Sequence, residues 1–181
     1  MGIEIADYDP RWPALEAEAI SELMEALPGA FTRIEHVGST SVPGLAAKPV
    51  IDLMAGTALL DAGSLDVTGA LADKLAAIGY LAADTGMPGR LFFYRDRDGR
   101  RAHHLHVVPD DTLDTRNEIL LRDYLRRSRA DAAEYGALKR DLAARGAEGL
   151  AYTKAKTEFI QRIVDAARTE RGLPLVSVWE E

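Results

Sequence analysis

Two short apolar segments, separated by a Gly-Ser-Thr-Ser turn and a Lys-Pro pair, constrain the fold of this chain more than any other feature. The first segment is Ile34–Val37 and the second is Val50–Met54, and each has the length and composition of a buried strand. Gly38 begins the turn, and a glycine lets backbone N–H groups come close to an oxyanion. Asp52 lies in the second segment. This layout suits a phosphate and a divalent cation.

The turn also carries side-chain donors. Ser39, Thr40 and Ser41 each supply a hydroxyl group. Lys48 could reach a phosphate as a point charge, although Pro49 restricts its backbone to extended geometry. The alternative explanation is a purely structural loop, held by Ser and Thr turns and capped by the strand carboxylate. The complete run favours a functional site over that alternative.

Hydrophobic spacing predicts an α+β protein. Strands are expected over residues 3–5, 31–37, 50–55, 91–95 and 103–109, and helices over residues 12–27, 65–78, 115–127, 130–145 and 152–168. Ser64 is expected to begin the second helix and Gly79 to end it. A turn at Asp98-Gly99 joins the last two strands. We therefore expect an α/β core over residues 1–110 and a helical half over residues 111–181, packed together as a single compact unit.

Composition excludes several classes of protein. The chain has 181 residues, 47% of them hydrophobic, which is enough for one well-cored domain. It has no cysteine, so a thiol nucleophile and a cysteine zinc site are excluded. No apolar run approaches the roughly 20 residues that cross a bilayer, and the acidic first residues are unlike a secretory signal, so we expect a cytoplasmic protein. The net charge of −7 argues against nonspecific binding to nucleic acids.

Three of the four histidines lie within residues 103–106. On a strand, His104 and His106 project to one face and His103 to the other. Together with Asp52 they would form a set of one carboxylate and two imidazoles, which suits manganese or zinc better than magnesium. The same pair could instead be two partly buried histidines, hydrogen-bonded to backbone or to Glu35. We therefore predict a divalent metal, which could be manganese, magnesium or zinc.

Four further side chains are candidates for substrate binding. His36 stands two residues before the glycine of the turn and could point toward the same cleft, whereas Glu35 should face the other way. Arg90 could bind an anion. So could Tyr152 together with Lys156, since residues four apart are neighbours on a helix.

Several segments resemble the sequence signature of one bacterial family. Residues 34–53, with the sequence IEHVGSTSVPGLAAKPVIDL, resemble the signature of the GrpB family. The resemblance extends to YDPRWP at residues 8–13, HLHV at residues 104–107, RDYLR at residues 122–126, and Tyr152, Lys156 and Phe159. It implies a nucleotidyltransferase-like fold, in which helices flank a mixed β-sheet and a Gly-Ser turn follows the first core strand.

One position departs from the pattern of active nucleotidyltransferases. Those enzymes usually carry Asp-x-Asp or Asp-x-Glu on the second strand, with both carboxylates on one side. Residue 54 shares the face of Asp52 and is methionine. A single aspartate holds two cations poorly, so the two-metal mechanism is in doubt. An acidic side chain folded beside Met54 would favour catalysis, and an apolar filling would favour a binding domain.

Three functions fit these observations. The leading one binds a nucleotide or a phosphorylated small molecule with a divalent metal and transfers a nucleotidyl group. In it, Asp52, His104 and His106 hold the cation or act as a base, while the turn and Lys48 hold phosphates. The second is a catalytically silent domain that binds a nucleotide or metabolite. The third is a metal-dependent hydrolase built on the His-x-His strand. The sequence leaves open whether the chain forms a homo-oligomer.

Overall fold

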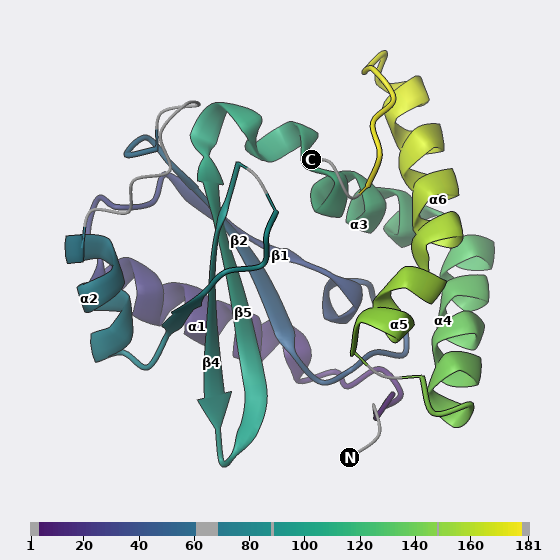
Figure 1. The fold of residues 1–181 in the computed structure, drawn as a ribbon, viewed down its shortest axis with the longest axis horizontal. Coiled ribbons are helices and arrows are strands. Elements are labelled where there is room, and N and C mark those ends of the chain that lie inside the picture. The colour runs from purple at the N-terminus through teal and green to yellow at the C-terminus, as the bar shows by residue number, and fades with distance from the viewer. Residues whose placement is uncertain (1–3, 61–68, 88, 148, 179–181) are drawn as a thin grey trace.

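The computed structural model describes residues 4–60, 69–87, 89–147 and 149–178, and it has a mixed β-sheet between two sets of helices (Figure 1). The described strands are β1 (Arg33–Val37), β2 (Ile51–Thr57), β3 (Leu81–Ala83), β4 (Leu91–Arg97) and β5 (Arg100–Pro109). The described helices are α1 (Trp12–Ala26), α2 (Gly69–Ala77), α3 (Asn117–Arg127), α4 (Arg129–Ala144), α5 (Gly149–Ala155) and α6 (Thr157–Glu170). Two short 3₁₀ turns are η1 (Ser39–Ser41) and η2 (Asp110–Thr115). The predicted α+β class is confirmed.

Strand order places the two central strands side by side. The order is β1-β2-β5-β4-β3, in which β2 and β5 run parallel and the other neighbours antiparallel. The register pairs Asp52 with Val37 on one side and with His104 on the other. Because directly paired residues share a face of the sheet, the carboxylate and this imidazole project in the same direction.

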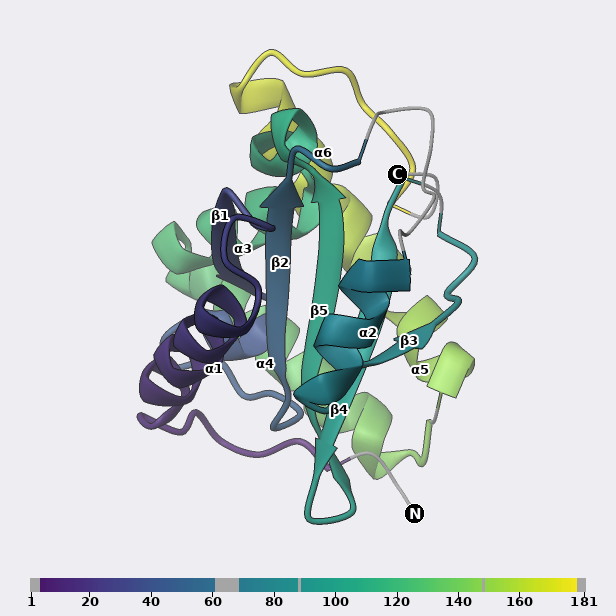
Figure 2. The ribbon, with the colours of Figure 1, turned by 90° about the vertical axis from the view of Figure 1, so that its left-hand side faces the viewer.

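One face of the sheet packs against α1 and α2, which lie in front of the strands in Figure 2. Leu53 and Leu105 point to this side and are fully buried, as are Leu23 from α1 and Leu75 from α2. This layer is the main hydrophobic core.

The opposite face is covered by η2 and the C-terminal helices. Met54 packs there with Val37 and Val108 of the sheet, and against Leu113 and Ile119 of the helical half. A third cluster joins the segment after the turn to α3, α4 and α6, through Val42, Leu45, Leu125, Tyr135, Phe159 and Ile163. The Gly38–Ser41 turn therefore lies against the helical half.

Two predicted elements differ from the structure, and one strand was not predicted. The strand expected at residues 3–5 is wrong for Glu4 and Ile5, because the chain pairs only through one bridge between Ala6 and Ala47; Ile3 lies outside the described residues. The helix expected over 152–168 is two helices, α5 and α6, which meet at Lys156. Strand β3 was not predicted, because all its residues are exposed and show no alternation. The predicted helix start at Ser64 also lies outside the described residues.

The predicted turn between β4 and β5 is confirmed. Asp98 has φ 51° and Gly99 has φ 72°, which is the left-handed backbone that a tight hairpin turn requires. None of the helices in the described ranges is both long and apolar enough to cross a membrane.

Candidate functional site

Gly38 lies in direct contact with Asp52, and no larger residue fits there. Its φ is 69°, a backbone conformation that residues with a side chain rarely adopt. A Cβ atom at this position would lie 2.3 Å from Oδ2 of Asp52. The turn therefore brings its backbone against the carboxylate because residue 38 is glycine.

Only one of the three hydroxyl residues of the turn lines the cleft beside Asp52. The buried Thr40 hydroxyl donates to the Val50 carbonyl (3.1 Å) and so accepts from Nε2 of His36 (2.8 Å). Ser41 is also buried, and its hydroxyl donates to the Gly38 carbonyl (2.5 Å). Both hydroxyls hold the turn in shape, which leaves Ser39 to meet a ligand.

Asp52 and His104 form a hydrogen-bonded pair. Nδ1 of the imidazole lies 2.7 Å from Oδ1 of the carboxylate, and the two side chains are 25% and 28% exposed. A carboxylate only accepts, so Nδ1 carries the proton and Nε2 is the nitrogen that can accept one. Burial alone would raise the pKa of Asp52, but the hydrogen bond and charge of His104 outweigh it and hold that pKa below its usual value.

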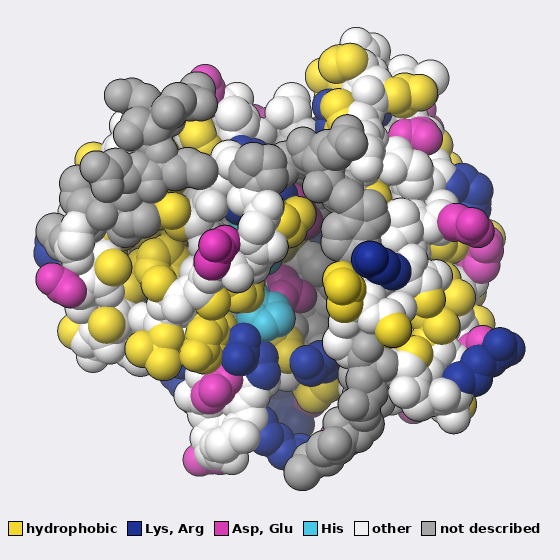
Figure 3. Space-filling model, in the orientation of Figure 1, with side chains coloured by type: hydrophobic (Ala, Val, Ile, Leu, Met, Phe, Trp, Pro, Cys, Tyr) yellow, Lys and Arg dark blue, Asp and Glu magenta, His cyan; other side chains and the backbone are white. Residues whose placement is uncertain are grey.

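These groups line a cleft of ≈ 380 Å³ between the sheet and the helical half, which we call the Asp52 cleft. Its lining residues are Ser39, Lys48, Val50, Asp52, His104, Lys139, Gly149, Tyr152, Thr153 and Lys156. Figure 3 shows a hollow between the two halves where histidine, acidic and lysine or arginine side chains gather. Three lysines from separate segments therefore face one carboxylate, which is an arrangement suited to an anionic ligand with several charges.

Lys139 is the most deeply buried of the three lysines. Its side chain belongs to α4 and the residue is only 2% exposed. The ammonium donates to Oγ of Ser39 (2.7 Å) and to the carbonyl of Ala46. Burial, followed by the charges of Lys156 and Arg140, lowers the pKa of Lys139 to about 7. An anion bound at Ser39 would favour the charged form.

Lys156 enters the cleft at the junction of α5 and α6. Its ammonium lies 4.4 Å from the ring centroid of Tyr152, so the predicted pair is formed despite the break in the helix. Burial lowers the pKa of Lys156 to about 8, and burial raises the pKa of Tyr152 to about 12. The third lysine, Lys48, is exposed at the rim.

His106 and Arg90 belong to a separate buried cluster. His106 shares the face of His104, but its Nδ1 lies 3.3 Å from the guanidinium of Arg90, which forms an ion pair with Glu118 of α3. Burial lowers the pKa of His106 to about 4. Within the described ranges, no three histidine, aspartate or glutamate side chains are grouped closely enough to hold a metal. The structure therefore gathers only Asp52 and His104 of the three expected ligands.

His36 and Glu35 point the opposite way from the sequence expectation. His36 pairs with Leu53 across the sheet and so lies on the core face, where burial lowers its pKa to about 4. Glu35 pairs with Met54 on the face of Asp52, and its carboxylate accepts from Arg122 of α3 (2.7 Å). The register between β1 and β2 decides which face each side chain occupies, and strand alternation alone does not predict that register.

Met54 occupies the position of the second carboxylate in active nucleotidyltransferases. It is fully buried and packs among apolar side chains. Glu118, the nearby acid of α3, is engaged with Arg90. Glu35 lies beside Met54 on the same face, but its carboxylate pairs with Arg122 and does not line the cleft. Met54 therefore fills the position with an apolar side chain, and Asp52 is the one carboxylate among the described lining residues.

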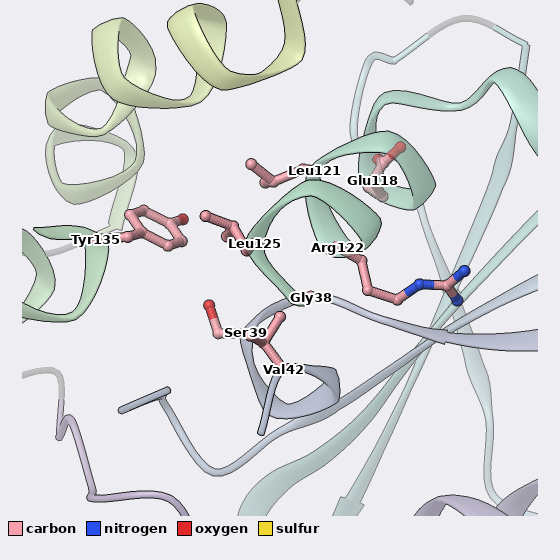
Figure 4. A pocket seen from close by; sticks show the side chains of 8 residues that line it. All are labelled: Gly38, Ser39, Val42, Glu118, Leu121, Arg122, Leu125 and Tyr135. Atoms are coloured by element: carbon pink, nitrogen blue, oxygen red, sulfur yellow. The ribbon is translucent and has the colours of Figure 1, made fainter. Parts of the chain in front are cut away.

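A smaller cavity of ≈ 60 Å³ lies on the helical side of the turn. Gly38 and Ser39 border it on one side and Leu121, Leu125 and Tyr135 on the other (Figure 4). Ser39 and Tyr135 turn their hydroxyl groups toward this space. Because its wall is mostly apolar, the turn packs against the helices on this side and does not face solvent.

Sequence reasoning missed Lys139. A signal for it was present, because Tyr135 and Lys139 are four residues apart on one helix, which is the spacing already noted for Tyr152 and Lys156. In both pairs the ammonium lies over the ring, at 4.5 Å for Lys139.

Comparison with known proteins identifies the family. The family model described as GrpB protein matches residues 2–166. A UPF0157 protein of Pseudomonas aeruginosa is 38% identical over 182 residues, which cover 96% of this chain and 71% of that protein. The crystal structure of the conserved protein GrpB from Enterococcus faecalis has a TM-score of 0.81 and 30% identity, and covers 93% of this chain and 99% of its own.

A more distant likeness concerns the fold alone. Terminal uridylyl transferase 4 from Trypanosoma brucei with bound CTP has a TM-score of 0.52 at 15% identity, over 97% of this chain and 56% of that one. The fold is therefore nucleotidyltransferase-like, as the sequence resemblance implied. Since the family model covers most of the residues and the relatives match nearly the whole length, the chain belongs to the GrpB family.

Proposed function

We propose that this protein binds a nucleoside triphosphate, or another small molecule with several phosphates, in the Asp52 cleft. The observation that carries the proposal is the convergence of Lys48, Lys139 and Lys156 with the Ser39 hydroxyl around a single carboxylate. Three cations in a partly closed cleft attract a polyphosphate more strongly than a singly charged anion. The nucleotidyltransferase-like fold supports a nucleotide as the carrier of those phosphates.

The donor set fits one divalent cation and does not fit two. Asp52 supplies a hard oxygen ligand, His104 is already hydrogen-bonded to that carboxylate through Nδ1, and Met54 offers no ligand. When bound, such a cation would neutralise phosphate charge and orient the phosphates. A single carboxylate oxygen beside phosphate oxygens suits magnesium or manganese, because hard cations prefer oxygen ligands.

Tyr152 would contribute apolar contact for the organic part of the ligand. Its buried ring forms one wall of the cleft beside Lys156. A base or ribose stacked there would leave the phosphates directed toward Ser39 and Lys139.

Nucleotidyl transfer is the second candidate, and the hydrogen bond between Asp52 and His104 favours it. Because Nδ1 donates to the carboxylate, Nε2 can accept the proton of an attacking hydroxyl group. The oxygen of that hydroxyl would bond to the α-phosphorus, and the bond from that phosphorus to pyrophosphate would break. The hydrolase built on both histidines loses its support, since His106 is engaged with Arg90.

Titration of wild type with ATP, CTP, GTP and UTP by calorimetry, each with magnesium, manganese or zinc, tests the binding proposal. We expect at least one triphosphate to bind, and Lys156→Met to weaken that binding roughly tenfold, the loss expected for one charge-assisted contact. The matched control is Lys154→Met, which removes an exposed lysine of the same segment outside the cleft. Equal loss in both variants, or no binding to wild type, contradicts the proposal.

Transfer is tested separately. A radiolabelled α-phosphate should move to protein or to an added hydroxyl compound with wild type and not with His104→Ala, while triphosphate binding survives in that variant. Binding without any label transfer would leave the protein as a binding domain.

A further inference from the structure

A second polar cavity touches the turn on the side away from the Asp52 cleft. It has a volume of ≈ 370 Å³, and Thr40 and Ser41 of the turn are among its lining residues. Its lining residues include members of the edge strand β1, the start of α1, and α3. Figure 2 shows where these three elements lie. None of its lining residues also lines the Asp52 cleft.

Three of the segments that carry the family resemblance meet at this cavity. Tyr8 and Pro13 come from the opening segment, Ser41 from the turn, and Arg122 and Arg126 from the first helix of the C-terminal half. Of these three segments, only the turn supplies a lining residue to the Asp52 cleft. The opening segment and the arginine-bearing helix are therefore not explained by the proposed function.

Two opposite charges face this cavity without pairing. Arg126 donates from Nε to the Ser41 carbonyl (3.0 Å), and within the described part of the chain no carboxylate lies within 4.0 Å of its guanidinium. Glu16 likewise forms no ion pair with any described residue. Arg126 is exposed and Glu16 is half-buried, so a ligand in the cavity can reach both side chains.

The remaining charges of the cavity wall are already satisfied. Arg122 donates to Glu35 (2.7 Å) and to Asp123 (2.8 Å), and the neighbouring His36 is hydrogen-bonded to Thr40 (2.8 Å). Arg126 and Glu16, which attract one another without forming an ion pair, are therefore the two charged groups that a ligand would meet.

We propose that this cavity binds a small zwitterion of the amino-acid type. Its anionic group would contact Arg126, its cationic group would contact Glu16, and its organic part would lie against Tyr8 and Pro13. A simple anion would be repelled by Glu16, and a simple cation would be repelled by Arg126. The proposal does not depend on nucleotide binding, because the two sites share no side chain.

Calorimetric titration of wild type with the individual L-amino acids tests this site. Acetate and methylammonium serve as probes that carry only one of the two charges. We expect at least one amino acid to bind, and to bind roughly tenfold or more tightly than either single-charge probe, since each charge-assisted contact contributes. Failure of every amino acid to bind overturns the proposal, and so does acetate that binds as tightly as the best amino acid.

Paired variants locate the binding. Arg126→Gln and Glu16→Gln should each weaken amino-acid binding roughly tenfold, because each removes one charged contact. The matched controls Arg127→Gln and Glu18→Gln change adjacent charges outside the cavity and should leave affinity unchanged. Thermal unfolding confirms that each variant is folded.

Affinity retained in both cavity variants overturns the assignment. Lys156→Met, which weakens triphosphate binding, should keep amino-acid binding, so that the two proposals fail separately.

Discussion

The two faces of the central strands β2 and β5 have opposite roles. On β2 and β5, Leu53 and Leu105 point toward α1 and α2 and are completely buried. One position away, Asp52 and His104 point to the other side and keep about a quarter of their side-chain surface exposed, 28% and 25%. Alternation along a strand therefore separates the residues that hold the fold from those that meet a ligand.

This separation has a testable meaning. Substitutions one position apart on the same strand should affect different properties, stability on the core face and ligand binding on the cleft face.

The largest expected effect comes from the core face. Leu105→Ala should lower the free energy of unfolding by about 3 kcal/mol, through lost apolar burial and the cavity left behind. Chemical denaturation measures it. Triphosphate affinity of the folded fraction should stay within about twofold of wild type, since the side chain of Leu105 points away from the Asp52 cleft. A large loss of affinity with no loss of stability would show that the faces are not separate.

Gly38→Ala should affect both properties. The positive φ and the contact with Asp52 should together cost about 1–3 kcal/mol of folding free energy, and displacement of the carboxylate should abolish any effect of a divalent cation on triphosphate binding. The control is Gly44→Ala, where φ is 79° but a new Cβ has no neighbour within 4 Å. Gly44→Ala should lose stability and keep the cation effect. If the two variants behave alike, contact with Asp52 is not what requires glycine at residue 38.

Asp52→Asn should change ligand binding and spare the fold. The change in unfolding free energy should be below about 1 kcal/mol at neutral pH, because the side chain keeps its shape and is partly exposed. The cation effect on triphosphate binding should disappear. Because the pKa of Asp52 is held low, its contribution to stability is present above the ordinary aspartate pKa and is lost as pH falls through the folded value. Wild type and variant should therefore converge in acid; unchanged cation dependence would contradict the assigned role.

The smallest expected effect is a pH dependence from Lys139. Its lowered pKa of about 7 means that triphosphate affinity should fall as pH rises above that value, since the charged form binds the anion. Calorimetry across this range, with Lys139→Met as the flatter comparison, measures it. The unliganded wild type should become more stable over the same range, because the unfolded chain still holds the proton. A wild-type profile as flat as that of the variant would remove Lys139 from the ligand contacts.

The sequence predicted four of the five described strands and the closeness of Asp52 to His104. Strand alternation and the Gly-Ser turn placed Asp52 near His104, and the structure brings these two side chains within hydrogen-bond distance. The sequence also placed Met54 on the face of Asp52, because residues two apart on a strand share a face. These inferences needed only local periodicity and the family resemblance.

The remaining features depend on packing that local patterns do not encode. The position of His36 follows from the register of β1 against β2, and His106 is held by Arg90 and by Glu118 from distant segments. The local sequence pattern predicts Lys139 to be an exposed helix residue, and only the packing of α4 against the turn buries it. Each case is a contact between segments far apart in sequence.

The hydrogen bond between Lys139 and Ser39 joins residues separated by 100 positions. Closing so long a loop carries an entropic cost that no local contact offsets, so this cleft exists only after the sheet and the helical half have assembled. An anion held by both residues would act as a cross-link between the first and last thirds of the molecule. Its binding should slow amide hydrogen exchange in α4 as much as in the turn itself. Exchange measured with and without the anion would therefore show whether the two segments are stabilised together.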